Sequence, residues 1–220
     1  MPEPCGSGID LVYVDESLLV LNKPPGLLSV PGRGQDKQDC LSRRVEQHFP
    51  DALIVHRLDM ATSGLMLMAR GSAAQRALSR SFERREVHKR YLAVVAGCLL
   101  PAEGADGWGL IDLPIAVDWP RRPLRVIDAV LGKPSQTRWQ VVAFDEATNS
   151  TRVTLEPITG RSHQLRVHLQ ALGHPMLGDR LYAPEAVQIK ASRLLLHACS
   201  LRLSHPVSSA LLFFESTPGF

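Results

Sequence analysis

The chain has 220 residues and a mass of 24.2 kDa, which allows one large domain or two small ones. Hydrophobic residues make up 45% and charged residues 21%, so the composition excludes intrinsic disorder and a collagen-like structure. No apolar run approaches the roughly 20 residues that span a bilayer, and the first ten residues lack the pattern of a secretory signal. We therefore expect a protein that does not associate with membranes.

The net charge is only +3, but its make-up is uneven, with 20 arginines and five lysines. Arginine presents a planar set of donors that can bind phosphate with two hydrogen bonds and stack on bases. A GC-rich genome also raises the arginine content, so the composition permits a nucleic-acid partner without requiring one. The four cysteines are far apart and form no C-x-x-C pair, which argues against a zinc ribbon and a disulfide framework. A reducing cytoplasm is the expected location.

The N-terminal half of the chain is predicted to contain short strands and two helices. Two apolar runs separated by Asp15-Glu16-Ser17 predict a β-hairpin, and Pro24-Pro25-Gly26 then predicts a turn. Strands are predicted over 11–14, 18–22, 65–69 and 91–96, and helices over 39–48 with Asp39 as N-cap and over 72–86 with Ser72 as N-cap.

The C-terminal half is predicted to begin with a Gly- and Pro-rich segment, 101–134, that is mostly loop with short strands. This segment holds Arg121 and Arg122 between two prolines. Strands are predicted over 137–144, 152–156, 194–197 and 211–214, and a helix over 162–172 followed by Gly173. Many strands, few helices and no internal linker predict a single α+β domain, 1–220, with a central mixed, largely antiparallel sheet flanked by helices and loops.

One segment that could carry chemistry is HRLDMATSGL, residues 56–65. It places an imidazole, a guanidinium and a carboxylate within four residues of a loop that enters a buried strand. A purely structural explanation is an Asx-type turn from Asp59 to Thr62 or Ser63.

A second segment is ITGRSHQLRVHL, residues 158–169, where helical spacing puts His163 and Arg166 on one face and Leu165 and Leu169 on another. An amphipathic helix with a solvated arginine explains the same pattern. A third segment, Lys89-Arg90-Tyr91, is a basic entry into a strand that begins with an aromatic residue.

Together these segments resemble the RluA family of RNA pseudouridine synthases. The resemblance covers nearly the whole chain, through NKPPGL (22–27), HRLDMATSGL (56–65), KRYLA (89–93), GKPSQT (132–137), PITGRSHQLRVH (157–168), LGHPMLGD (172–179), LLLHA (194–198) and SHP (204–206). We expect no S4-like RNA-binding domain, and Asp118-Trp119-Pro120 resembles the short branch of the family. Pro25, Ser135 and residues 121–130 depart from the common pattern.

The resemblance implies a pseudouridine synthase fold and the isomerisation of uridine in RNA. Asp59 matches the family's catalytic aspartate, Arg166 the arginine that pairs with it, and Tyr91 the tyrosine placed against the uracil. Covalent attack of Asp59 on C1′ and formation of a glycal are both compatible with the residues. The substrate-binding residues implied are His56, Arg57, Leu58, Arg161 and His163, with Arg57 filling the space left by a flipped base.

The resemblance also implies the partners, which are 23S-type large-subunit ribosomal RNA and a tRNA anticodon arm. No metal and no organic cofactor is implied, and we expect a monomer. A set of basic residues is expected to contact phosphates, namely Arg76, Arg80, Arg84, Arg85, Lys89 and Arg90.

Two alternatives stay open from the sequence. One is a catalytically inactive RNA-binding module of the same fold. The other is a hydrolase that uses Asp59 as nucleophile on a small glycoside. Such an enzyme needs a second carboxylate, and Glu156 is the nearest candidate in these motifs.

Overall fold

The computed structural model describes residues 8–104 and 106–220, which form two compact units. Unit 1 consists of the residues up to Lys89 together with His197–Gly219, and unit 2 consists of Arg90–Leu196 with Phe220. The chain passes between the units within two strands, β5 (His88–Ala96) and β11 (Leu196–Ser204). The expectation of one domain over 1–220 stays a prediction.

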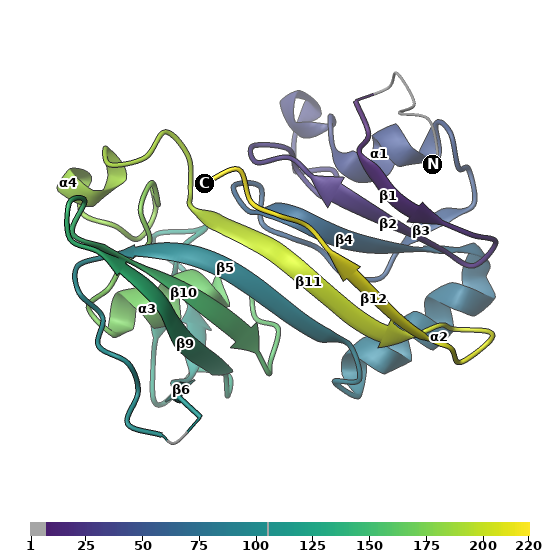
Figure 1. The fold of residues 1–220 in the computed structure, drawn as a ribbon. Coiled ribbons are helices and arrows are strands. Elements are labelled where there is room, and N and C mark those ends of the chain that lie inside the picture. Colours follow the sequence, from purple (N-terminus) through teal and green to yellow (C-terminus); the bar gives the residue numbers. More distant parts are fainter. Residues whose placement is uncertain (1–7, 105) are drawn as a thin grey trace. The chain divides into compact units, whose positions relative to one another are not determined.

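Unit 1 is built on a sheet with strand order β1-β2-β4-β11 (Figure 1). The predicted hairpin is confirmed, since β1 (Leu11–Val14) pairs antiparallel with β2 (Leu18–Lys23). Next to β2 lies β4 (Ser63–Arg70). In addition, β3 (Ala52–Ile54) pairs with β4, and β12 (Leu211–Glu215) pairs with β11. The pairing of β4 with β11 is parallel. Seven of the eight residues of β4 are buried, as expected for a central strand.

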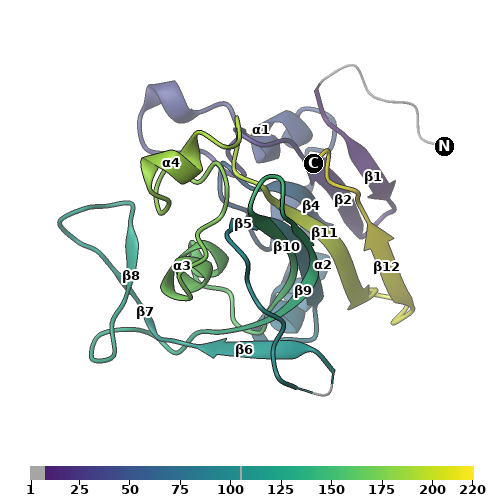
Figure 2. The same ribbon diagram turned by 60° about the vertical axis from the view of Figure 1, so that its left-hand side comes forward.

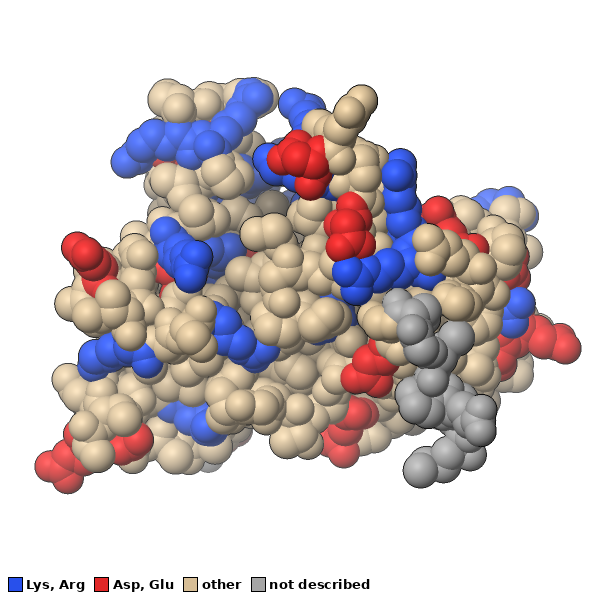
Figure 3. Space-filling view, turned by 90° about the horizontal axis from the view of Figure 1, so that it is seen from above, with Lys and Arg blue, Asp and Glu red and all other residues tan. Residues whose placement is uncertain are grey.

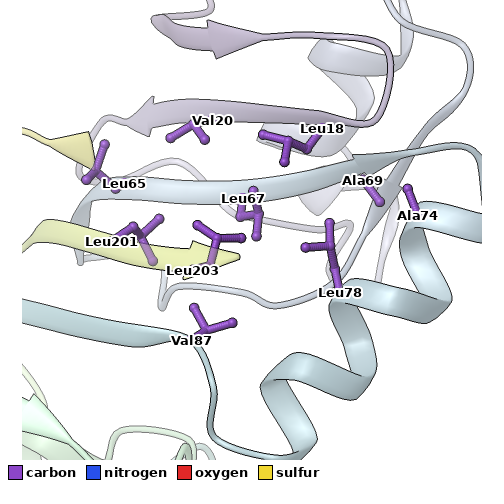
Figure 4. Packing of buried hydrophobic residues seen from close by; sticks show 10 residues of the cluster. All are labelled: Leu18, Val20, Leu65, Leu67, Ala69, Ala74, Leu78, Val87, Leu201 and Leu203. Carbon is purple, nitrogen blue, oxygen red and sulfur yellow. The ribbon is translucent and has the colours of Figure 1, made fainter. Parts of the chain in front are cut away.

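One core cluster of unit 1 lies between a face of this sheet and α2 (Gly71–Glu83) (Figure 4). Alternate residues of β4, such as Leu65 and Leu67, point to this face, as the period of two in a strand requires. The cluster consists of Leu18, Val20, Leu65, Leu67, Ala69, Ala74, Leu78, Val87, Leu201 and Leu203. It fixes the start of β4, and with it the loop that carries HRLD.

The two predicted N-caps in unit 1 are wrong. Cys40, not Asp39, precedes α1 (Leu41–Glu46), because the Asp39 carboxylate accepts hydrogen bonds from Arg44 at 2.7 and 2.8 Å. Ser72 lies inside α2, because the backbone N–H of Gly71 donates to Asp51 O at 2.9 Å and satisfies the helix start one residue earlier. A short 3₁₀ helix, Gln35–Lys37, was not predicted.

Unit 2 contains an antiparallel sheet in the order β5-β10-β9-β6 (Figure 2). Besides β5 it consists of β6 (Trp108–Asp112), β9 (Gln136–Asp145) and β10 (Ser150–Pro157). A separate antiparallel pair is formed by β7 (Ile115–Val117) and β8 (Arg125–Ile127). The Gly- and Pro-rich segment is therefore loop with short strands, as predicted.

Two helices belong to unit 2, α3 (Gln164–Ala171) and α4 (Glu185–Gln188), of which α4 was not predicted. Gly173 follows α3 with φ +83°, which confirms it as the residue that ends the helix. The predicted start at Ser162 is wrong. His163 has φ +59°, in the left-handed region, so the helical conformation begins only at Gln164.

These elements confirm the predicted α+β class. Within the described part of each unit, strand pairs are antiparallel except β4 with β11. The prediction of a strand over 194–197 is wrong in its limits, because β11 begins at Leu196 and continues to Ser204 as the partner of β12. None of the helices in residues 8–104 and 106–220 has the length and apolar character needed to span a bilayer.

We predict that Gly64→Ala lowers the free energy of unfolding by at least about 3 kcal/mol. Gly64 has φ +109°, and a Cβ built there would lie 2.3 Å from the carbonyl oxygen of Ala198, so β4 and β11 would have to separate. Gly26→Ala is the matched control, because φ is +85° but nothing lies within 4 Å of its Cβ, and it should cost only about 1 kcal/mol. Urea unfolding measures both, and equal losses would contradict this account.

Candidate active site

The loop between β3 and β4 carries Asp59, and the backbone is held on both sides of this residue. On one side, the Leu58 N–H donates to Ser29 Oγ at 3.1 Å, and Ser29 Oγ donates to Leu58 O at 2.7 Å. On the other side, Met60 O accepts from the Gly26 N–H at 2.8 Å. The carbonyl oxygen of Asp59 itself accepts the Thr62 N–H at 3.1 Å. Asp59 therefore lies in a fixed turn, with a partly buried side chain.

Lys23, at the end of β2, is fully buried and helps to hold the same loop. Its Nζ donates to the carbonyl oxygens of Pro24 and Leu27, both at 2.8 Å, and of Met60 at 3.1 Å. A buried ammonium requires such partners. The sequence motif NKPPGL was interpreted as a turn, and this role of Lys23 was missed. A lysine directly following an apolar strand was the available signal.

His56 attaches the start of the loop to β4. Its Nε2 accepts the Leu67 N–H at 2.8 Å, and its ring stacks on Phe82 with centroids 4.7 Å apart. Burial, with a smaller contribution from the nearby Lys89 ammonium, lowers the pKa of His56 from 6.5 to about 3. The imidazole is therefore neutral at pH 7, with its proton on Nδ1. These contacts make His56 a residue that positions the loop.

The neighbours of Asp59 in the motif differ in exposure. Arg57 is exposed, as a residue that contacts RNA requires, whereas Leu58 is only 5% exposed. The sequence places Leu58 among the substrate-binding residues, but its side chain is part of the protein interior.

In unit 2, Arg166 forms a buried, two-pronged ion pair with Asp179. Its Nε and Nη2 donate to the two carboxylate oxygens at 2.8 and 2.6 Å, and the side chains are 4% and 0% exposed. Asp179 also accepts the N–H groups of Leu181 and Tyr182. Such a pair fixes the plane of the guanidinium. Arg166 is thus a rigid group on α3, and Asp179 is the fixing residue that sequence reasoning did not single out.

Tyr182 connects Arg166 with a second predicted residue, His163. The guanidinium of Arg166 lies 5.0 Å from the centroid of the Tyr182 ring, and the Tyr182 hydroxyl is 2.6 Å from His163 Nδ1. The same hydroxyl accepts the Arg125 N–H at 2.9 Å. Burial is the main cause that raises the pKa of Tyr182 to about 12, so it stays protonated at neutral pH. Tyr182 was not predicted as a site residue, because it lies far in the sequence from both His163 and Arg125.

The remaining predicted residues of unit 2 lie on neighbouring elements. Tyr91 is in β5, opposite Leu155 of β10, and is 9% exposed. Arg161 is exposed in the loop before α3, and its backbone N–H donates to Gln164 Oε1 at 3.0 Å. Asp59 belongs to unit 1, whereas Tyr91 and Arg166 belong to unit 2. A common site for the three residues therefore stays a prediction.

The residues expected to contact phosphates fall into two groups. Arg76, Arg80, Arg84 and Arg85 are exposed on or directly after α2. Arg90 instead pairs with Glu156 at 2.7 Å, and burial lowers the pKa of Lys89. Lys and Arg side chains also occur on the face seen in Figure 3, with acidic residues between them.

Glu156, the candidate second carboxylate of a hydrolase, is occupied by two arginines. Its oxygens accept from Arg90 at 2.7 Å and Arg138 at 3.2 Å. Such pairing favours a structural role. Among residues 8–104 and 106–220, no group of three or more His, Cys, Asp or Glu side chains has an arrangement that could hold a metal ion.

Comparison with known proteins gives a consistent result. The family model for RNA pseudouridylate synthase matches residues 17–171. The chain is 49% identical over 210 residues to the "Dual-specificity RNA pseudouridine synthase RluA" of Escherichia coli (strain K12), covering 96% of this chain and 93% of the relative. The protein of the same name from Salmonella typhimurium is 50% identical over 211 residues, with the same coverage.

Solved structures agree with these matches. "Human RNA Pseudouridylate Synthase Domain Containing 1" superposes with a TM-score of 0.78 and 30% identity, covering 99% of this chain and 87% of the other. The chain therefore belongs to the RNA pseudouridylate synthase family. It is an isomerase that acts on RNA, which confirms the predicted family and enzyme class, and nothing in the matches favours an inactive binding module.

We predict that Lys23→Met lowers the free energy of unfolding by roughly 2–5 kcal/mol, because it removes the donor shared by three carbonyl oxygens. Activity should fall as well, since Met60 adjoins Asp59. The exposed Lys37→Met is the control and should stay within about 0.5 kcal/mol of the wild type. Urea unfolding and product formation measure both effects. A Lys23 variant as stable as the control would refute the role assigned to this ammonium.

We predict a pH dependence of stability from His56. The unfolded imidazole takes up a proton below pH 6.5, whereas the folded one stays neutral down to about pH 3. Its contribution is therefore complete above pH 6.5 and is lost as the pH falls towards 3, by up to about 1.4 kcal/mol per pH unit. In His56→Gln, whose amide oxygen can accept the same N–H, the loss between pH 7 and 5 should be smaller by about 2 kcal/mol. Urea unfolding at both pH values tests this, and an unchanged difference would contradict it.

Proposed function

We propose that the protein isomerises uridine to pseudouridine in both 23S-type large-subunit ribosomal RNA and a tRNA anticodon arm. The observation that carries this proposal is the 49% identity, over 96% of the chain, to a relative named a dual-specificity RNA pseudouridine synthase. The enzyme acts in the cytoplasm as a monomer and needs no metal or organic cofactor. Residues 1–220 form one catalytic domain, in which unit 1 supplies Asp59 and unit 2 supplies Tyr91 and Arg166.

Asp59 acts on the sugar of the target nucleotide. Isomerisation breaks the bond between N1 and C1′, forms a bond between C5 and C1′, moves the C5 proton away and leaves a proton on N1. A carboxylate beside C1′ promotes the first step either by attacking C1′ or by assisting formation of a glycal. The fixed backbone around Asp59 supports this role, because an anchored carboxylate needs little reorganisation to reach the sugar.

Arg166 orients the Asp59 carboxylate and favours its ionised form. Asp179 occupies Nε and Nη2 of the guanidinium, which supports a fixed direction for the rest of the group. A guanidinium has five N–H donors, so it can serve two carboxylates at once. Arg166 is therefore suited to bind Asp59 while Asp179 holds its plane.

Tyr91 stacks on the uracil ring, an interaction worth about 1–3 kcal/mol per base. Its position in β5 supports this role, because a strand residue paired with β10 has a fixed backbone. The Tyr91 hydroxyl is also a candidate for accepting or relaying the C5 proton.

The target base must leave its stack, which costs a few kcal/mol. Arg57 fills the vacated space with its planar guanidinium, and its exposure supports this role. His56 positions the loop, Leu58 anchors it from the interior, and Arg161 and His163 bind the substrate from the start of α3. The exposed arginines of α2 contact phosphates.

We predict that Asp59→Ala abolishes pseudouridine formation and leaves RNA binding nearly intact, because it removes the reacting carboxylate but no phosphate contact. Cells lacking the protein are complemented with the wild type, Asp59→Ala or the exposed Asp36→Ala. Pseudouridine is then mapped across ribosomal RNA and tRNA. The wild type and the Asp36 variant should restore sites in both RNA classes, and the Asp59 variant in neither. Sites in only one class would reject dual specificity, and full activity of the Asp59 variant would reject the mechanism.

For Arg57→Ala we predict a loss of activity that is at least about tenfold larger on a structured stem-loop than on a flexible oligonucleotide, because only the former must unstack its target base. Single-turnover rates on both RNAs provide the measurement. Arg43→Ala, which removes an exposed arginine from α1, is the control and should affect both RNAs alike. Equal losses on both substrates for Arg57→Ala would indicate a structural role instead.

A further inference from the structure

The segment between β7 and β8, residues 117–125, presents an aromatic and two basic side chains to solvent, and we call it the arm. Trp119 is 67% exposed, the Arg121 side chain is 71% exposed, and Arg122 is exposed as well. A tryptophan is usually well buried. The roles assigned to the catalytic and substrate-binding residues do not explain these three side chains.

The arm has a fixed conformation despite its exposure. The Asp118 N–H donates to Leu124 O at 3.1 Å, which closes the loop, and the Leu124 N–H donates to Arg121 O at 3.0 Å. The buried Asp118 carboxylate accepts from the backbone N–H of Arg121 at 3.2 Å and from its guanidinium at 2.7 Å. The arm is therefore organised before it meets any partner.

Trp119 and Arg122 form a stack on the arm. The guanidinium carbon of Arg122 lies 3.4 Å from the centroid of the indole ring. Because Trp119 remains 67% exposed with Arg122 on one face of its ring, the other face is accessible. A flat aromatic surface backed by a cation is a favourable platform for a nucleobase.

The base of the arm is attached to residues already placed in the substrate site. Leu124 packs against the cluster of Ile115, Val167 and Tyr182, and β8 lies beside α3 (Figure 2). The Arg125 N–H donates to the Tyr182 hydroxyl, whose ring contacts Arg166. All of these residues belong to unit 2, so the arm is held in a fixed relation to Arg166.

We propose that the arm binds an unpaired nucleotide of the substrate RNA near the target uridine, with the base stacked on the free face of Trp119 and a neighbouring phosphate bound by Arg122. This inference rests on the proposed function and adds a site that selects the RNA. Two exposed arginines with one buried carboxylate make the arm electropositive, which favours an anionic partner such as RNA over a neutral or basic surface. The exposed indole face beside Arg122 favours RNA over an acidic protein surface, because nucleobases stack on such a face. Arg121, held by Asp118, adds positive charge without being free to stack.

The test measures binding and single-turnover kinetics of the full chain on a stem-loop RNA. Trp119→Ala should weaken binding about 5- to 150-fold, the range for losing one stacked base, with little change in the rate at saturating RNA. Arg122→Ala should weaken binding and reduce the slope of log Kd against log salt by about one. Arg122→Lys should retain the salt slope but lose the affinity that depends on stacking. An exposed apolar residue and an exposed arginine outside the arm provide the controls, Leu131→Ala and Arg202→Ala, which should bind like the wild type.

Abasic substitutions along the loop of the RNA identify the stacked nucleotide. At one position, removal of the base should weaken binding to the wild type but not to Trp119→Ala. The inference is overturned if both arm variants bind and modify the RNA like the wild type. That result would indicate that the arm binds a protein and not RNA. A wild type that neither binds nor modifies RNA would instead refute the proposed function, so the two failures are distinguishable.

Discussion

The anchored backbone around Asp59 is the constraint on which the rest of the site depends. Ser29 holds the residue before it, and Gly26 and Lys23 hold the residue after it. These anchors are the last residue of β2 and residues of the segment that follows it, and the core of unit 1 fixes β2 in place. A carboxylate that must act on a sugar carbon has to be held within a fraction of an ångström of its working position. In this chain the rigidity comes from backbone hydrogen bonds and one buried ammonium.

Much of the fold could be predicted from the sequence because its signals are local. Apolar runs and turn residues are sufficient to predict the hairpin of β1 and β2, the strand β4 and the end of α3 at Gly173. The errors concern helix starts. Asp39 and Ser72 are residue types that often cap helices. The Asp39 carboxylate binds Arg44 instead, and at the start of α2 the backbone carbonyl of Asp51 accepts the Gly71 N–H, so the helix begins before Ser72. Competition between partners is decided by tertiary structure, which a local pattern does not contain.

The candidate site was predicted only in part, for the same reason. Motif resemblance points to Asp59, Tyr91 and Arg166, since the residues lie in distinctive segments. Asp179 lies 13 residues from its partner Arg166, and Tyr182 lies 19 residues from His163 and 57 from Arg125. No pattern in the sequence links such pairs. The burial of Leu58 and the neutral state of His56 likewise depend on packing against other elements.

The most direct measurement is a crystal structure of the protein bound to a stem-loop RNA that carries 5-fluorouridine at the target position. Fluorine at C5 replaces the proton that has to leave, so the complex cannot complete the reaction. The account predicts an extruded nucleotide with C1′ about 3–3.5 Å from an Asp59 carboxylate oxygen, and Tyr91 and Arg166 in the same site. Bound RNA whose nucleotide sugars all lie far from Asp59 would contradict it.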